Sequence, residues 1–213
     1  MSVGSDCTRC ETAGVKHLLA LALICACSSK APAPVEKPVE PAPAPAPAPV
    51  PEPAPTGPVT RGDVISPPFK AADLQRAMPV GTEIRYRITA TGKPPVIEHW
   101  RVTAADDKGC TIHTIVYAND GTTQIEDKGP ATAAWSDLEK HGEFPATYTS
   151  TREATIVVAA GRFDTWFFEI RPSEKGQPTR RLHFARTIPG PPVWMEVSND
   201  GVVALHLELV SRK

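Results

Sequence analysis

No apolar run in this sequence is long enough to cross a bilayer as a helix. The most apolar stretch, between His17 and Ser28, has about ten consecutive apolar residues, whereas a membrane-spanning helix needs ~20. Lys16 and His17 stand directly before it. A short apolar core after a basic residue is typical of a secretory signal peptide, which is removed from the mature protein.

Cysteine is scarce where disulfides would matter. Of the five cysteines, Cys7, Cys10, Cys25 and Cys27 lie before or within the apolar stretch, and Cys110 is the only one beyond it. A C-x-x-C pair without a second pair, as at positions 7 and 10, is weak evidence for a metal or redox site. The folded part must be stabilised by its core, and Cys110, in an alternating apolar pattern, is typical of a buried inert thiol.

Neither sign of charge dominates, and the common catalytic and metal-binding spacings are missing. The chain has 23 basic and 24 acidic residues, so nothing in its net charge attracts nucleic acid. Beyond the apolar stretch there is no C-x-x-C, H-x-H, H-E-x-x-H or G-x-S-x-G pattern, the spacings that zinc sites and serine nucleophiles use. We therefore expect no catalytic, cofactor-binding or metal-binding residues and no enzyme activity.

The end of the apolar stretch carries a motif. Ile24-Cys25-Ala26-Cys27 resembles the lipobox of bacterial lipoproteins, with a branched apolar residue, a small residue and then the cysteine that receives the lipid. The resemblance implies that residues 1–26 are a lipoprotein signal peptide and that Cys27 is the lipidated first residue of the mature chain. A second register would lipidate Cys25, but it places Ile24 where a small residue is expected.

Two further expectations follow from the residues around this motif. Val15-Lys16-His17-Leu18 reads as an ordinary signal start, so we expect Val15 to be the true initiator and residues 1–14 not to be translated. Ser28 stands where, in the best-known lipoprotein sorting rule, an aspartate retains the protein in the inner membrane. The resemblance therefore implies an outer-membrane lipoprotein, facing the periplasm or the cell surface.

Proline is abundant between the lipobox and the folded part. The chain has 24 prolines, and residues 27–58 carry one at nearly every second position from Ala31 onward. Proline fixes φ and removes the amide donor, so neither helix nor sheet forms there. At ~3.1 Å per residue such a linker spans on the order of 80 Å, and we expect a disordered spacer that holds the domain off the membrane.

Residues 59–213 alternate as strands do. In residues 84–88 apolar side chains alternate with charged ones, and Asn119-Asp120-Gly121 and Asn199-Asp200-Gly201 are hairpin turn signals. Short local connections favour antiparallel pairing. We expect one mainly β domain, a strongly curved sheet or open barrel of about eight or nine strands, with a closed barrel as the alternative. Short helices are expected at 70–78 and 130–141.

The last third of the chain carries a second resemblance. Residues 160–165, Ala-Gly-Arg-Phe-Asp-Thr, and residues 189–197, Pro-Gly-Pro-Pro-Val-Trp-Met-Glu-Val, followed by an Asp-Gly turn, are similar to families of uncharacterised envelope proteins with all-β domains. Those domains look loosely like the unclosed β-barrels of lipoprotein carriers. The resemblance implies this fold and brings no catalytic residue with it.

Three aromatic residues are candidate ligand or surface contacts. Phe167 and Trp194 have the opposite strand phase to Trp166 and Met195, so they point away from the core, either as an apolar contact surface or under a covering segment. Trp135 is expected on a helix packed against the sheet. We expect a membrane-anchored, non-catalytic binding or structural module. The alternative is a carrier of lipid or another hydrophobic ligand, which requires an apolar cavity of at least ~300 Å³ between helix and sheet.

Overall fold

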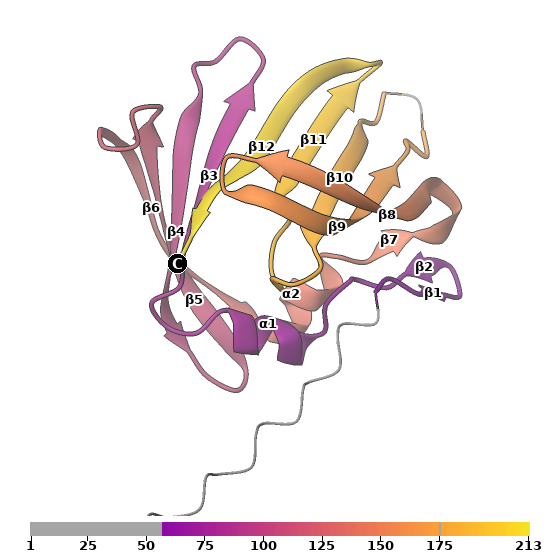
Figure 1. The fold of residues 1–213 in the computed structure, drawn as a ribbon, viewed down its shortest axis with the longest axis horizontal. Helices are drawn as coiled ribbons and strands as arrows, with labels where there is room; N and C mark the ends of the chain where they lie inside the picture. Colours follow the sequence, from indigo (N-terminus) through magenta and orange to yellow (C-terminus); the bar gives the residue numbers. More distant parts are fainter. Residues whose placement is uncertain (1–56, 175) are drawn as a thin grey trace, which may run out of the picture. The chain divides into compact units, whose positions relative to one another are not determined.

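The computed structural model describes residues 57–174 and 176–213 (Figure 1). The predicted signal peptide, the lipidation at Cys27 or Cys25, and all but the last two residues of the predicted linker lie outside the described residues. The part that is described contains the whole of the predicted β domain except position 175.

Nine antiparallel strands form the main sheet, in the spatial order β6-β5-β4-β3-β12-β11-β10-β9-β8. The predicted mainly β, open architecture is confirmed, and the closed-barrel alternative is wrong because β6 and β8 end the sheet without pairing to each other. The strands are β3 (Glu83–Ala90), β4 (Val96–Ala105), β5 (Gly109–Ala118), β6 (Gln124–Ala134), β8 (Thr149–Val158), β9 (Gly161–Ile170), β10 (Thr179–Ala185), β11 (Trp194–Asn199) and β12 (Val202–Arg212).

The sheet consists of two runs of hairpins joined in the middle. Strands β3 to β6 pair in sequence order, and so do β8 to β12. The last strand then pairs with the first, so that Leu205 lies opposite Ala90 and Leu209 opposite Tyr86. The sheet curves strongly, and its concave face looks toward the helices (Figure 1).

Two short helices, a 3₁₀ turn and a small sheet cover the concave side (Figure 1). The small sheet contains strands β1, β2 and β7, and the two helices pack against each other. The elements are β1 (Thr60–Arg61), β2 (Val64–Ile65), α1 (Ala71–Ala77), α2 (Trp135–Lys140), β7 (Phe144–Pro145) and the 3₁₀ turn (Ala146–Tyr148).

The helix predicted at 70–78 is confirmed as α1, but the one predicted at 130–141 is wrong in its first part. Residues up to Ala134 belong to β6, with Pro130 opposite His113, and the helix begins only at Trp135. β6 is an edge strand, where a proline without an amide donor is tolerated. Pairing with β5 therefore overrides the helical spacing of the alanines.

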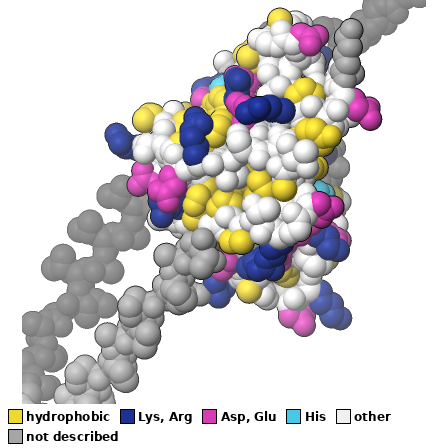
Figure 2. Space-filling view, turned by 90° about the vertical axis from the view of Figure 1, so that its right-hand side faces the viewer, with side chains coloured by type: hydrophobic (Ala, Val, Ile, Leu, Met, Phe, Trp, Pro, Cys, Tyr) yellow, Lys and Arg dark blue, Asp and Glu magenta, His cyan; other side chains and the backbone are white. Residues whose placement is uncertain are grey.

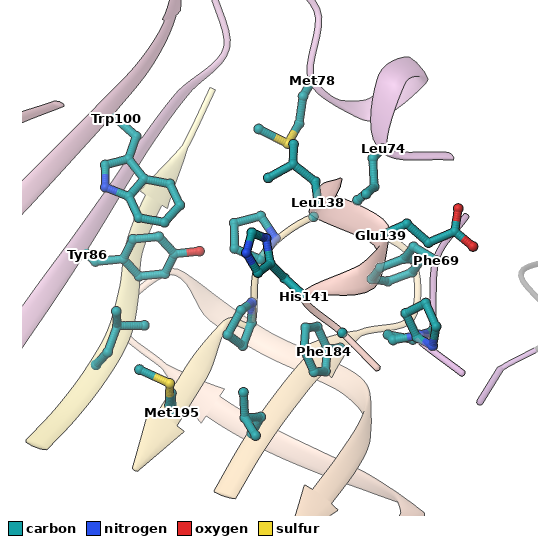
Figure 3. A pocket seen from close by; sticks show the side chains of 18 of the residues that line it. Phe69, Leu74, Met78, Tyr86, Trp100, Leu138, Glu139, His141, Phe184 and Met195 are labelled. Carbon is teal, nitrogen blue, oxygen red and sulfur yellow. The ribbon is translucent and has the colours of Figure 1, made fainter. Parts of the chain in front are cut away.

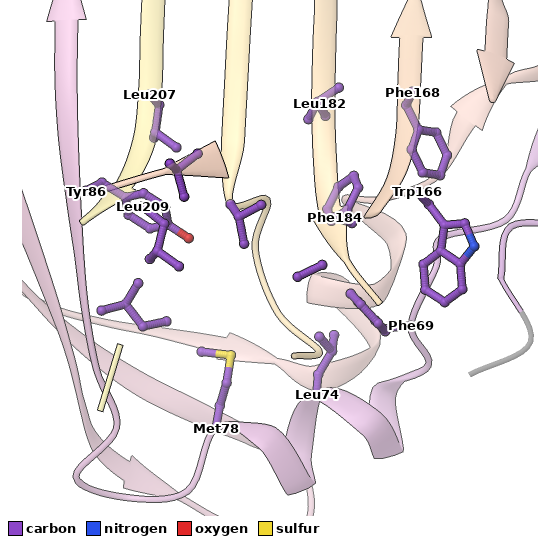
Figure 4. Packing of buried hydrophobic residues seen from close by; sticks show 14 of the residues in the cluster. Phe69, Leu74, Met78, Tyr86, Trp166, Phe168, Leu182, Phe184, Leu207 and Leu209 are labelled. Atoms are coloured by element: carbon purple, nitrogen blue, oxygen red, sulfur yellow. The ribbon is translucent and has the colours of Figure 1, made fainter. Parts of the chain in front are cut away.

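The core lies between the concave face and the covering elements (Figure 4). Phe168 is fully buried and packs edge-on against Phe184, with ring centroids 5.4 Å apart. Leu74 and Met78 of the α1 region cover the sheet from the other side. Cys110 is buried among these residues, and burial raises the pKa of its thiol.

Candidate functional site

An apolar cavity of about 390 Å³ lies between the concave face of the sheet and the helices (Figure 3). Its volume exceeds the ~300 Å³ at which pockets begin to hold small ligands. Leu74, Met78 and Leu138 line it from the helical side. The sheet contributes Tyr86, Trp100, Ile112, Leu182, Phe184, Met195 and Leu207.

Aromatic rings of two neighbouring strands form one wall of the cavity. Tyr86 on β3 and Trp100 on β4 meet edge to face, with ring centroids 5.3 Å apart. Alternation along each strand turns these side chains to the concave face, as predicted for Tyr86 from the pattern of residues 84–88. Burial raises the pKa of the Tyr86 phenol well above its ordinary value, and the positive charge of Arg212 works in the opposite direction.

Besides the Tyr86 hydroxyl, polar groups of α2 and of the residue after it line the cavity. Glu139 and His141 line it together with Gly142 and Pro67. A Cβ at Gly142 would lie 2.7 Å from the Cβ of Pro67, closer than side chains approach. Gly142 therefore allows the segment before α1 to pack directly against the end of α2.

The side chain of Glu139 connects the two helices. Its carboxylate accepts a hydrogen bond from the backbone amide of Ala71 at 2.8 Å and one from the ammonium of Lys70 at 3.1 Å. Burial works to raise the pKa of Glu139, but these two partners outweigh it and hold the pKa below its ordinary value. The ionised carboxylate thus satisfies the first amide of α1, which has no partner within its own helix.

We expect the α1–α2 contact to weaken in acid. Because the folded-state pKa of Glu139 is depressed, its contribution to stability is present above the ordinary glutamate pKa of ~4.3 and is lost as pH falls through the folded value. The variant Glu139→Gln should unfold more easily by about 0.5–2 kcal/mol at pH 7, in the range of lost helix caps. Urea titrations at pH 7 and pH 3 measure the difference, which should shrink at pH 3.

The neighbouring exposed Glu143 is the matched control for this measurement. The variant Glu143→Gln should leave the free energy of unfolding within ~0.5 kcal/mol of the wild type. An equal loss for Glu139→Gln at both pH values would show that the charge of Glu139 does not carry the contact.

A loop pinned by an arginine closes another side of the cavity. Gly190, Pro191 and Pro192, between β10 and β11, line it. Arg212 on β12 donates to the carbonyl of Pro189 at 3.0 Å and to the carbonyl of Ala77, at the end of α1, at 2.5 Å. The Arg212 side chain thereby ties α1 and this loop to the middle of the sheet.

Gly190 is required for this arrangement. Its φ is +148°, and a Cβ there would lie 3.0 Å from Nη1 of Arg212. Sequence analysis identified the Pro-Gly-Pro-Pro segment only as part of a family resemblance. The partner Arg212 follows it by 22 positions, and no local signal links the two.

Phe167 and Trp194 lie on the convex face, away from the cavity. Phe167 is only 6% exposed because the guanidinium of Arg152 lies over its ring, 4.1 Å from the centroid. The imidazole of His183 stands between the two aromatics, 4.8 Å from Phe167 and 5.3 Å from Trp194. His206 follows beyond Trp194 at 5.4 Å. The covering of Phe167 comes from a charged side chain of the next strand.

The convex residues Arg152, Phe167, His183, Trp194 and His206 form a row across β8 to β12, which we call the convex row. Trp194 is half-buried in it. A space-filling view of the β8 side of the molecule shows small apolar areas separated by basic and acidic side chains (Figure 2). The role of Phe167 and Trp194 as contact residues stays a prediction.

Trp135 is 3% exposed and begins α2. Its indole nitrogen donates a hydrogen bond to the carbonyl of Asp106 at 2.9 Å. The cavity wall on α2 is supplied by Leu138 and Glu139 instead. Trp135 therefore anchors α2 to the turn between β4 and β5, and its predicted ligand contact also stays a prediction.

The histidines of the domain lie on separate elements: His99, His113, His183 and His206 on four different strands, and His141 directly after α2. His113 pairs with Asp127 at 2.7 Å and His183 with the hydroxyl of Thr165 at 2.9 Å. Within residues 57–174 and 176–213, no group of three or more His, Cys, Asp and Glu side chains is placed to hold a metal ion. None of the helices in this part of the chain has the length and apolar character needed to cross a membrane.

Comparisons with known proteins show likeness in shape alone. No family model matches the sequence, and no curated protein matches it. Part of the chain is similar to MucB in complex with MucA(peri), at 12% identity and a TM-score of 0.44 over 67% of this chain and 53% of that one. The match to MucB alone has 12% identity and a TM-score of 0.42, and it covers 67% of this chain and 56% of that one. The match to the Pseudomonas aeruginosa MucA/MucB complex has 12% identity and a TM-score of 0.44, and it covers 67% of this chain and 54% of that one. The match spans about half the length of those chains.

Proposed function

We propose that residues 59–213 form a non-catalytic domain that binds a hydrophobic ligand, an acyl chain in particular, in the cavity between sheet and helices. The cavity itself carries this proposal: its volume is about 390 Å³ and its walls are apolar side chains of the sheet, α1, α2 and the proline loop. A filled core at this place would have removed the carrier hypothesis. The proposal needs no catalytic residue, cofactor or metal.

Packing considerations support a ligand there. The cavity is open on one side, and lining side chains such as Trp100, Ile112 and Met195 are only half-buried. In the free protein their apolar surface faces water instead of packing partners. A hydrocarbon chain supplies such partners and removes apolar surface from water, at about 25 cal/mol per Å².

The predicted leader and linker indicate where the domain acts. A lipid on Cys27, or on Cys25 in the alternative register, would hold the chain in a bacterial membrane. Ser28, at the sorting position after Cys27, favours the outer membrane. The proline-rich linker gives the domain a reach on the order of 80 Å. A domain so tethered collects a ligand from the envelope or passes it on without leaving the membrane surface.

A binding or structural role toward another envelope protein is the second candidate. The observation that favours it is the convex row, a continuous set of aromatic and imidazole rings on the face that the helices leave uncovered. Alanine substitution of Trp194 would weaken such a partner complex without affecting ligand in the cavity. Cross-linking in intact cells, followed by mass spectrometry, separates the two roles.

Filling the cavity tests the first role. Ile112 and Met195 line the cavity and come from different strands, β5 and β11, so larger side chains at both positions are expected to take up part of its volume. The double variant Ile112→Trp/Met195→Trp should bind a fluorescent apolar probe such as 1-aminoanthracene at least tenfold more weakly than the wild type. It should also lose lipids that co-purify with the wild-type protein, as measured by mass spectrometry.

The matched control adds two tryptophans outside the cavity. Val157 and Val203 are 72% and 43% exposed and do not line it, so Val157→Trp/Val203→Trp should bind the probe as the wild type does. Equal binding by both double variants would place the probe elsewhere and refute the cavity as the ligand site. Circular dichroism and thermal unfolding establish that both variants are folded.

A further inference from the structure

The hydroxyl of Tyr86 stands out among the groups that line the cavity. The residue is 1% exposed, and its ring extends from β3 with the hydroxyl directed into the cavity (Figure 3). Within residues 57–174 and 176–213, this hydroxyl has no hydrogen-bond partner in the protein, and it borders the open space of the cavity. The other side chains of the sheet wall are hydrocarbon, thioether or indole.

The hydroxyl faces the open space of the cavity, and it is not one of the fully buried polar atoms without a partner in the described part of the chain. Its donor is therefore left for whatever occupies the cavity. A ligand that fills this space either accepts the hydrogen bond or leaves the hydroxyl without a partner. Phenylalanine would keep the edge-to-face contact with Trp100 and the shape of the wall, but it would offer no donor.

The groups around the hydroxyl indicate what kind of atom it can bind. Arg212 acts on the Tyr86 phenol electrostatically, but its donors bond the carbonyls of Pro189 and Ala77, and it does not line the cavity. The charged group that does line the cavity is the carboxylate of Glu139, on the helical side. The Tyr86 hydroxyl is therefore the donor of the sheet wall, and a carbonyl or carboxylate oxygen at the end of an acyl chain is an acceptor that fits it.

We propose that Tyr86 is a specificity-determining residue of the cavity, and that its hydroxyl donates a hydrogen bond to the carbonyl or carboxylate oxygen of a bound acyl chain. This proposal rests on the proposed function, since it needs an apolar ligand in the cavity. The proposal also places the polar end of the bound acyl chain next to β3 and β12. A pure hydrocarbon of equal length would bind without this contact.

The test compares Tyr86→Phe with the wild type in displacement of 1-aminoanthracene by octanoic acid, methyl octanoate and n-octane. Wild-type protein should bind all three, the two acyl compounds more tightly. In Tyr86→Phe both acyl compounds should lose about tenfold in affinity, the size of one hydrogen bond. Octane should change by less than twofold, because the substitution keeps the apolar wall.

The control variant is Tyr148→Phe, which removes the hydroxyl of a 40% exposed tyrosine outside the cavity and should leave all three affinities unchanged. If Tyr86→Phe loses affinity for octanoic acid alone, the hydroxyl binds the free carboxylate. If it loses affinity for both octanoic acid and methyl octanoate, the hydroxyl binds an acyl carbonyl.

Two results would overturn the assignment of Tyr86 while leaving the cavity as the ligand site: unchanged affinity of Tyr86→Phe for every compound, or an equal loss that includes octane. If none of the three compounds displaces the probe from the wild type, the proposed function fails, and the role of Tyr86 fails with it.

Discussion

The variant Cys27→Ala is expected to carry no lipid and to appear in the soluble fraction of the cell envelope. The predicted diacylglyceryl group on Cys27 would contribute about 0.8 kcal/mol for each CH₂ that it buries, and two chains suffice for stable anchoring where one does not. The apolar stretch before it is too short to span the bilayer. Removal of the single thiol should therefore abolish stable attachment. Fractionation and mass spectrometry of the N-terminal peptide measure both effects.

The matched control is Cys25→Ala, two positions earlier. This variant should keep the lipid on Cys27 and stay with the membranes, since alanine at this position preserves the pattern of an apolar stretch ending in a small residue and cysteine. The reverse outcome, with lipid lost only in Cys25→Ala, would move the anchor to the second register. Lipid on neither cysteine in the wild type would refute the lipoprotein assignment.

The variant Phe168→Ala is expected to lose about 3–5 kcal/mol of stability, the usual range for removing a fully buried phenylalanine. Its ring is 0% exposed and lies between those of Phe144 and Phe184, with centroid distances of 5.5 and 5.4 Å. Truncation leaves a void where β7, β9 and β10 meet. The total free energy of unfolding of a small domain is only ~5–15 kcal/mol, so this variant should lose a large share of the stability.

Urea unfolding followed by tryptophan fluorescence measures this loss. The control is Val157→Ala on β8, whose side chain is 72% exposed, and it should change the free energy of unfolding by less than ~0.5 kcal/mol. A loss below 1 kcal/mol for Phe168→Ala would mean that the surrounding rings collapse into the space. It would contradict the rigid packing of this part of the core.

The strands and their direction could be predicted from sequence because each depends on local patterns. The alternation of Ile84, Tyr86 and Ile88 and the Asn-Asp-Gly turns at 119–121 and 199–201 specify hairpins without reference to the rest of the chain. The same reasoning failed at Pro130, where the decisive fact is that β6 is a sheet edge. Whether a strand is central or at an edge depends on the whole topology.

The candidate site was less predictable than the fold. The sequence does not predict the cavity between helix and sheet, because empty space has no sequence pattern. The carrier hypothesis merely requires such a cavity. The bonds of Arg212 to Ala77 and Pro189 join segments far apart in the chain. Phe167 was correctly placed on the opposite face from Trp166 by strand phase, yet its cover, Arg152, follows only from the register of β8 with β9.

The pairing of β12 with β3 has a consequence for how the domain forms. Ala90 and Leu205 are neighbours in the middle of the sheet, so the two hairpin runs join only after nearly all of the domain has left the ribosome. Closing so long a loop is slow compared with forming the hairpins. Were the predicted signal peptide to direct export, this order would leave the first half of the chain without a complete sheet until translation is nearly finished.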